Sequence, residues 1–195
     1  MAELATRPAI LDRLKQETRV YHLALESHLA FLTEDVTVGP YRKLLAAFYG
    51  FYLPWEDAIR PWREEIFGEA APAREKTASL IEDLSFFEVA IDCLPICCQT
   101  PPADGLPAAL GNLYVMEGAT LGGRLIALNV ERSLQLSGYR GYKFFSSYGI
   151  NAGPMWRAFR KALTDLSTRA NEEKIIDSAT AAFKSMRAWL MKEGF

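Results

Sequence analysis

Apolar residues recur at helical spacing along almost the whole of this 195-residue chain, and no segment shows the sustained alternation of a β-strand. The segments with this spacing, apart from one that carries glycines, are 10–32, 41–67, 71–87, 155–169 and 171–193. Half of the residues are hydrophobic and 24% are charged, as in an ordinary globular protein. We therefore predict one all-α domain that spans residues 1–195.

Prolines and polar residues give the expected helix boundaries. Pro54 and Pro61 are expected to kink or divide the helix within 41–67. Pro72 suits the first turn of the helix that follows. Asn171 is expected to cap the last helix, because two glutamates follow it in the first turn.

The charge balance excludes several classes of partner. A formal net charge of −2 gives no overall field that would recruit nucleic acid or a membrane surface. No apolar run approaches the length of a membrane span, and charges occupy the place where a signal peptide needs an apolar core. We expect a cytoplasmic protein. Cys93, Cys97 and Cys98 lack the usual zinc spacing and are expected to be free thiols.

Three glycines, Gly118, Gly122 and Gly123, interrupt a further helical segment, 113–130. Each glycine costs a helix interior about 1 kcal/mol relative to alanine. Gly118 and Gly122 are four residues apart and share a helix face. Such a face allows either close packing of another helix or the approach of a flat ligand to the bare backbone. Taken alone, the glycines favour packing.

The two histidines of the chain differ in their neighbours. Glu26 lies four residues after His22, where its carboxylate can accept the second N–H of the imidazole and strengthen a metal-ligating nitrogen. Lys15 lies two turns earlier and Arg19 one turn earlier on the same predicted face, and both could bind an anionic group. His28 has no such neighbours, and we expect no site role for it.

Two stretches in this order, "LKQETRVYHLALES" and "YVMEGATLGGRLI", followed by "FFSSYG", give the sequence its resemblance to a known family. The chain resembles heme oxygenase over most of its length. It is most similar to the bacterial members, including those that supply bilin to bacteriophytochromes. The resemblance implies an α-helical fold with heme between a proximal and a distal helix.

The resemblance also implies roles for individual residues. His22 matches the axial ligand of the heme iron, and Glu26 matches its hydrogen-bonding partner. Lys15 matches a position that pairs with a heme propionate, and Arg160 falls near a second such position. The remaining matches lie on the distal helix and are Tyr114, Gly118, Gly122 and Gly123.

One position departs from the family pattern. Many members carry an aspartate directly after the first distal glycine, where it holds a water network near bound dioxygen. This chain has Ala119 there, and the hydroxyl of Thr120 lies elsewhere on the helix. Proton delivery is therefore expected to use other groups, or waters held by backbone carbonyls.

The function implied by the resemblance is oxidative cleavage of heme to biliverdin, carbon monoxide and ferrous iron. Dioxygen is the co-substrate. The sequence carries no flavin or nicotinamide motif, so the electrons are expected from an external donor such as ferredoxin or a flavoprotein reductase. A bacteriophytochrome is a candidate acceptor of the biliverdin.

Three alternatives remain open from the residues alone. Ala119 also fits a non-catalytic heme-binding or heme-sensing protein on the same fold. A different enzyme on a related helical scaffold is a second alternative, either a thiaminase-like hydrolase or a di-iron oxidase, although the latter needs more ligands than two histidines supply. The third is a helical interaction module without heme affinity.

Overall fold

The computed structural model describes residues 9–195, and over this range the chain is all-α, which confirms the predicted fold class. The α-helices are α1 (Ile10–Glu17), α2 (Arg19–Glu26), α3 (Val38–Phe67), α4 (Thr77–Phe86), α5 (Leu106–Ser133), α6 (Lys143–Ser146), α7 (Ala152–Leu166) and α8 (Glu172–Lys192). Short 3₁₀ turns are found at Ser27–Thr33, Gly68–Ala70, Pro72–Arg74 and Gly149–Asn151. None of the helices in the described range is both long and apolar enough to cross a lipid bilayer.

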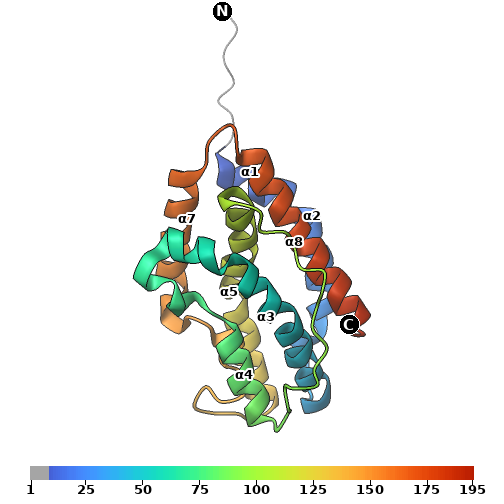
Figure 1. The fold of residues 1–195 in the computed structure, drawn as a ribbon. Helices are drawn as coiled ribbons and strands as arrows, with labels where there is room; N and C mark the ends of the chain where they lie inside the picture. The colour runs from blue at the N-terminus through green and yellow to red at the C-terminus, as the bar shows by residue number, and fades with distance from the viewer. Residues whose placement is uncertain (1–8) are drawn as a thin grey trace, which may run out of the picture.

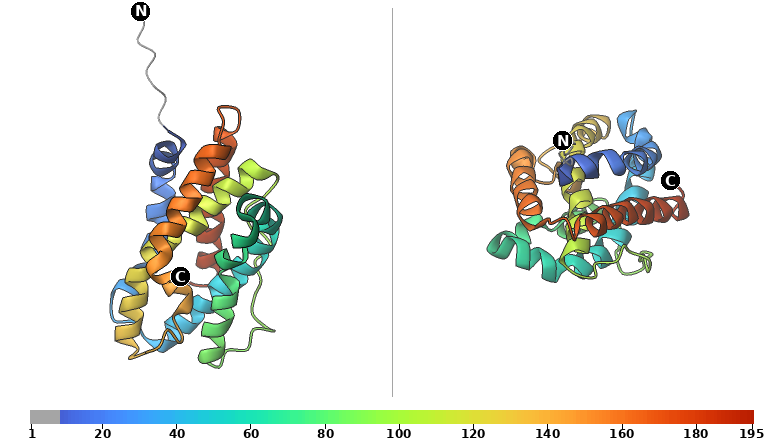
Figure 2. Two further views of the ribbon diagram at one scale, coloured as in Figure 1. Left: turned by 90° about the vertical axis from the view of Figure 1, so that its left-hand side faces the viewer. Right: turned by 90° about the horizontal axis from the view of Figure 1, so that it is seen from above.

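Helix α5 is the central element of the bundle (Figure 1). Seen from above, it lies between α7 on one side and α1 and α2 on the other (Figure 2). It packs along α8, α7 and the short helix α6. Its crossing with α8 is close because Gly111 has no side chain: a Cβ there would overlap the Ile175 carbonyl oxygen and lie 2.8 Å from the Ala179 nitrogen.

The predicted first helix, 10–32, is wrong as a single element. Helix α1 ends at Glu17, α2 begins at Arg19, and a 3₁₀ turn follows from Ser27. The break falls at Thr18, whose hydroxyl donates a hydrogen bond to the Leu14 carbonyl oxygen at 2.6 Å. This bond competes with regular helix geometry and bends the backbone. The two histidines, which were expected on one helix, lie on different elements, because α2 ends at Glu26 and His28 belongs to the 3₁₀ turn that follows.

The prolines of α3 were expected either to kink this helix or to divide it. They do not divide it. Pro54 has no N–H for the carbonyl of Gly50, four residues earlier. The Cys97 N–H donates to that carbonyl instead, at 2.8 Å, from the loop between α4 and α5. Pro61 similarly leaves the carbonyl of Asp57 without its helical partner, but Asp57 is exposed, so water can satisfy this group.

Two predicted helix starts need correction. Pro72 begins a 3₁₀ turn and not α4, which starts at Thr77. Asn171 occupies the residue before α8, as predicted, but its side chain does not cap that helix. Its Oδ1 instead accepts a hydrogen bond from the Thr168 N–H at 2.7 Å, and its Nδ2 donates to the Leu166 carbonyl oxygen at 3.1 Å. The asparagine therefore holds the turn between α7 and α8.

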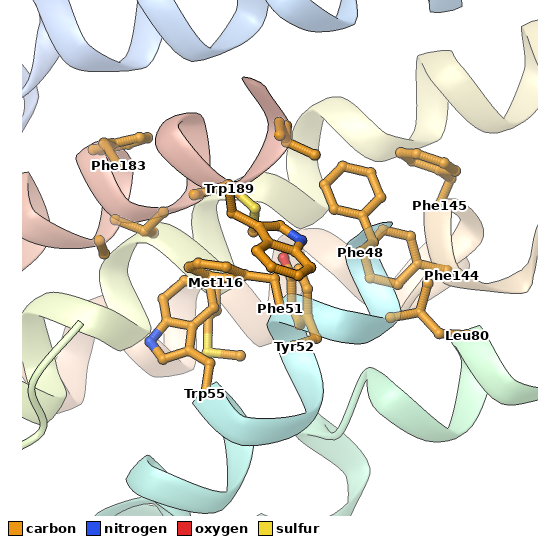
Figure 3. Packing of buried hydrophobic residues seen from close by; sticks show 14 of the residues in the cluster. Phe48, Phe51, Tyr52, Trp55, Leu80, Met116, Phe144, Phe145, Phe183 and Trp189 are labelled. Atoms are coloured by element: carbon orange, nitrogen blue, oxygen red, sulfur yellow. The ribbon is translucent and has the colours of Figure 1, made fainter. Parts of the chain in front are cut away.

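An aromatic core surrounds the middle of α3. Its side chains come from α3, α5, α6 and α8, and Figure 3 shows the rings of α3 meeting those of α6. The Phe48 ring centroid lies 5.2 Å from that of Phe144 and 5.9 Å from that of Phe145. The residues labelled in the figure are Phe48, Phe51, Tyr52, Trp55, Leu80, Met116, Phe144, Phe145, Phe183 and Trp189.

We predict that Gly111→Ala destabilises the protein, because the added methyl group forces α5 and α8 apart. Overpacking of this kind typically costs about 1–3 kcal/mol. Gly39→Ala is the matched control, since a Cβ at Gly39 meets nothing within 4 Å. Urea unfolding of both variants measures the effect. Equal stability of Gly111→Ala and the unchanged protein would contradict the packing argument.

Candidate functional site

A largely apolar cavity of about 420 Å³ lies between α2 and α5. Helix α2 and the turn after it form one wall, the glycine-bearing part of α5 forms another, and aromatic side chains of α3, α6 and α8 close the space. Residues that line it include His22, Leu25, Glu26, Leu29, Phe48, Tyr52, Tyr114, Met116, Ile126, Phe144, Phe145, Trp156, Phe183 and Met186, together with residues 118–123 of α5.

His22 lines this cavity from α2. Its Nδ1 lies 3.5 Å from Oε2 of Glu26, so the spacing of four residues brings the carboxylate to the imidazole as predicted. The edge of the ring packs against Phe183 of α8, with the ring centroids 5.5 Å apart. Within residues 9–195, Nε2 on the other side of the ring makes no hydrogen bond. This nitrogen could therefore serve as a ligand to the metal of a bound cofactor.

Gly118 and Gly122 expose their backbone to the cavity. A Cβ at Gly118 would lie 3.8 Å from the Trp156 ring, an ordinary contact, and a Cβ at Gly122 would meet nothing within 4 Å. Neither residue has the positive φ that favours glycine. Packing and backbone conformation therefore do not explain these two glycines. Close helix packing, the explanation favoured from the glycines alone, is wrong for both Gly118 and Gly122.

Gly123 differs from its two neighbours. It also lines the cavity, but it is buried, and a Cβ there would lie 2.7 Å from the Phe145 carbonyl oxygen. Its bare backbone lets α5 approach the backbone of α6. For this glycine the packing explanation holds.

Tyr114 lies in the cavity wall beside Trp156 of α7, with the two ring centroids 5.9 Å apart. Burial raises the pKa of the Tyr114 hydroxyl above its usual value, and a hydrogen bond with Thr18 opposes that rise. The predicted contact residue is therefore in place, close to the break between α1 and α2.

The three predicted cations do not line the cavity. Lys15 is exposed near the end of α1, Arg19 is the exposed first residue of α2, and Arg160 is exposed on α7. Helices α1 and α7 are neighbours, so Lys15 and Arg160 belong to adjacent elements. Their assignment to anionic groups of a ligand stays a prediction.

His28 lies outside the cavity lining, and both its ring nitrogens contact protein groups. Nδ1 is 3.2 Å from the Phe195 carbonyl oxygen, and Nε2 accepts a hydrogen bond from Nε of Arg187 at 3.1 Å. It joins the turn after α2 to the C-terminal end of the described chain.

The sequence analysis missed a buried charged cluster that borders the cavity. Nη1 of Arg74 lies 2.8 Å from Oε2 of Glu117, and each side chain is only 2% exposed. The Tyr148 hydroxyl donates to Oε1 of Glu117 at 2.9 Å. Lys76, which lines the cavity, places Nζ 3.5 Å from the centre of the Tyr148 ring. Glu117 itself was the available signal, as a charge inside the otherwise apolar face of a predicted helix.

Lys76 has an unusual environment for a lysine. Burial lowers the pKa of its ammonium group to about 8, although the carboxylates of Glu117 and Glu56 favour the charged form. The guanidinium groups of Arg74 and Arg63 add to the lowering. Both protonation states are therefore populated near pH 8.

Ala119 places no polar group at the cavity, as the sequence indicates. The hydroxyl of Thr120 donates to the Glu117 carbonyl oxygen of its own helix at 2.7 Å. In the part of the chain that the structure describes, no group of three or more His, Cys, Asp or Glu side chains could hold a metal ion. The three cysteines are free, as predicted.

The fold and the site define a helical protein with one histidine in an apolar cavity, opposite a stretch of bare helix backbone. The heme oxygenase family model matches residues 9–192. The chain therefore belongs to the heme oxygenase family. A heme oxygenase of Xanthomonas campestris pv. campestris (strain 8004) is 27% identical over 159 residues, which cover 81% of this chain and 93% of the relative.

Solved structures share the fold. The heme oxygenase of Neisseria meningitidis, solved in NO- and CO-bound forms, has a TM-score of 0.77 at 21% identity and covers 95% of this chain and 92% of that one. The heme oxygenase of Leptospira interrogans has a TM-score of 0.74 at 19% identity, with 95% and 100% covered. Heme oxygenase-1 of Synechocystis sp. PCC 6803, in complex with heme, has a TM-score of 0.73 at 18% identity, with 95% and 92% covered.

We predict opposite stability effects for two neighbouring glycines. Gly122→Ala should stabilise the ligand-free protein by up to about 1 kcal/mol, the gain in helix propensity. Gly123→Ala should destabilise it by about 1–3 kcal/mol, because the methyl group meets the backbone of α6. Thermal melts of the two variants measure both changes. A destabilised Gly122→Ala protein would contradict the assignment of that residue to the cavity.

We predict a pH-dependent effect of Lys76→Met on stability. The folded-state pKa of Lys76, about 8, lies below the ordinary lysine value of 10.5 that applies in the unfolded chain. Between these values the unfolded chain binds more protons, so this lysine makes the free energy of unfolding rise with pH. The stability of Lys76→Met relative to the unchanged protein should therefore fall from pH 7 to pH 10. Urea unfolding at several pH values measures the difference, and a constant difference would contradict the lowered pKa.

Proposed function

We propose that the cavity binds heme and that the chain cleaves this heme oxidatively. The products are biliverdin, carbon monoxide and ferrous iron, and dioxygen is the co-substrate. One observation carries the proposal: His22 shares an apolar cavity with the uncovered backbone of Gly118 and Gly122. Membership of the heme oxygenase family supports it, as does the complex of the Synechocystis enzyme with heme.

The residues present fit a heme group. His22 would hold the iron through Nε2, while Glu26 orients the imidazole from the Nδ1 side. The backbone at Gly118 and Gly122 would lie along the other face, where a side chain would fill the space needed for a small ligand. Heme supplies the iron at which dioxygen is reduced and the ring that is oxidised.

The cavity walls have a part in this function. Aromatic and aliphatic side chains exclude bulk water, which strengthens electrostatic interactions within the site. Lys15 on α1, Arg19 at the start of α2 and Arg160 on α7 would pair with the propionates in solvent, because α1 neighbours both α2 and α7. Tyr114 would contact the ring from α5.

Electrons have to come from a separate redox protein, because the sequence carries no flavin or nicotinamide motif. A ferredoxin or a flavoprotein reductase has the required chemistry. A bacteriophytochrome is our proposed acceptor of biliverdin, on the basis of the resemblance to the bacterial members alone.

A second candidate function is heme binding without turnover. Ala119 favours it, because no side chain at that position can order water above the ring. The test adds hemin to the purified protein, then a reductant in air. An enzyme loses its Soret band and yields a bilin that chromatography identifies, whereas a carrier keeps its heme spectrum.

We predict that His22→Ala removes the histidine-ligated ferric heme spectrum and the bilin product, because no other described histidine lines the cavity. His28→Ala is the matched control. It removes the other histidine, whose nitrogens already contact Phe195 and Arg187. Absorption and electron paramagnetic resonance spectra of the hemin-loaded variants measure the ligation.

Loss of the spectrum in His28→Ala, with His22→Ala unaffected, would overturn the site. Imidazole added to His22→Ala provides a further check, since a vacated axial position should accept it and restore a nitrogen-ligated spectrum.

A further inference from the structure

The apolar lining of the cavity is interrupted at one place, where Lys76 and Ser147 border it. Lys76 directly precedes α4, and Ser147 follows α6. Neither has a part in the heme contacts proposed above. Lys76 is 5% exposed, so its ammonium group reaches solvent chiefly by way of the cavity.

The carboxylates near Lys76 are already engaged with other donors. Glu117 contacts Arg74 and accepts from the Tyr148 hydroxyl. Glu56 accepts from the backbone N–H groups of Lys76 and Thr77, at 2.7 and 2.9 Å. It also accepts from the Thr77 hydroxyl at 2.6 Å. Within residues 9–195, Nζ of Lys76 therefore has the Tyr148 ring as its contact and forms no hydrogen bond or ion pair.

Ser147 provides an independent observation at the same place. Its Oγ is buried and has no hydrogen-bond partner among the described residues. Its backbone has φ 42°, in the left-handed region that a serine rarely adopts. Unsatisfied buried polar groups are costly, and a water or ligand that fills the cavity can satisfy both side chains.

We propose that Lys76 and Ser147 hold ordered water in the cavity and that Lys76 donates protons through this water to the oxygen that is reduced there. This inference rests on the proposed function. In each cycle one proton leaves Nζ and reaches the reacting oxygen, and the neutral amine regains a proton from solvent through the cavity mouth. No electron passes through the lysine. The role is one that Ala119 cannot perform.

The charged groups around Lys76 suit it to this exchange. Glu56 and Arg63 face it from α3, Arg74 from the turn before α4, and Glu117 from α5. Two carboxylates favour the ammonium form, whereas two guanidinium groups and burial favour the amine. A proton donor works best when its pKa lies near the working pH.

The first test needs no heme. In protein labelled with ¹³C and ¹⁵N lysine, the Cε chemical shift of Lys76 is followed against pH by NMR, and Lys76→Met assigns the signal. We expect a midpoint about 2 pH units below that of an ordinary lysine. Glu117→Gln should lower the midpoint further, because it removes a nearby anion. An ordinary midpoint in the unchanged protein would overturn the proposal.

The second test uses hemin-loaded protein and the pH midpoint between its acidic and alkaline ferric spectra. A nearby cation favours the alkaline form, so Lys76→Met should raise this midpoint by about half a pH unit or more. Lys76→Arg should keep it close to that of the unchanged protein. Lys174→Met, an exposed site on α8, is the matched control and should have no effect. The Lys76→Met variant should also slow bilin formation at least tenfold.

The outcomes separate the two proposals. Lys76→Met could bind heme and form bilin at the unchanged rate, with the same pH midpoint between its ferric spectra. That result would overturn the role of Lys76 and leave the proposed function intact. A much weaker hemin affinity in Lys76→Met with no change in midpoint would make Lys76 a contact for a propionate, and would likewise overturn proton donation. A protein that binds no hemin would overturn both.

Discussion

The shape of the cavity depends on how closely α8 and α6 approach the backbone of α5. Gly111 lets α8 meet the backbone of α5, and Gly123 lets α6 do the same about three turns further along. Between these two contacts, a Cβ at Gly118 would make only an ordinary contact with the Trp156 ring, and a Cβ at Gly122 would meet nothing within 4 Å. One helix therefore carries two kinds of glycine, and the tightly packed ones fix the walls around the uncovered ones. The cavity exists because α5 is held on either side of it.

Helix α2, which forms the opposite wall of the cavity, packs less tightly against the rest of the protein than α5 does. Helix α2 buries none of its eight residues, and the Val20 and Leu23 side chains are 64% and 52% exposed. Its histidine is half exposed, at 51%. A flat apolar ligand between α2 and α5 would bury surface that this short helix otherwise leaves in contact with water. Ligand binding and the stability of α2 are therefore linked, since any ligand that binds only the folded state stabilises it.

The sequence predicts the all-α class, the helical course of α5 and the pairing of His22 with Glu26, because each depends on local spacing. It does not predict the continuity of α3 through Pro54, which relies on a hydrogen bond from Cys97 in a distant loop. The break at Thr18 depends on one side-chain hydrogen bond that competes with the helix. The family resemblance implied a site role for all three distal glycines, and only the geometry distinguishes Gly123, which packs against α6, from Gly122.

Glu117 was the one sequence signal of the charged cluster, and its partners could not be predicted for the same reason. Arg74, Glu117 and Tyr148 come from three separate segments and meet only after folding. Burying an ion pair rarely adds net stability, since desolvation offsets much of the attraction. Apolar residues of similar size would fill this space at less cost. Retaining charges beside an apolar cavity is therefore hard to explain by stability, and departures from the rules of folding concentrate at functional sites. On this argument the cluster and the bare glycines belong to one site: the glycines leave space for a ligand, and the cluster supplies the polarity that Ala119 lacks.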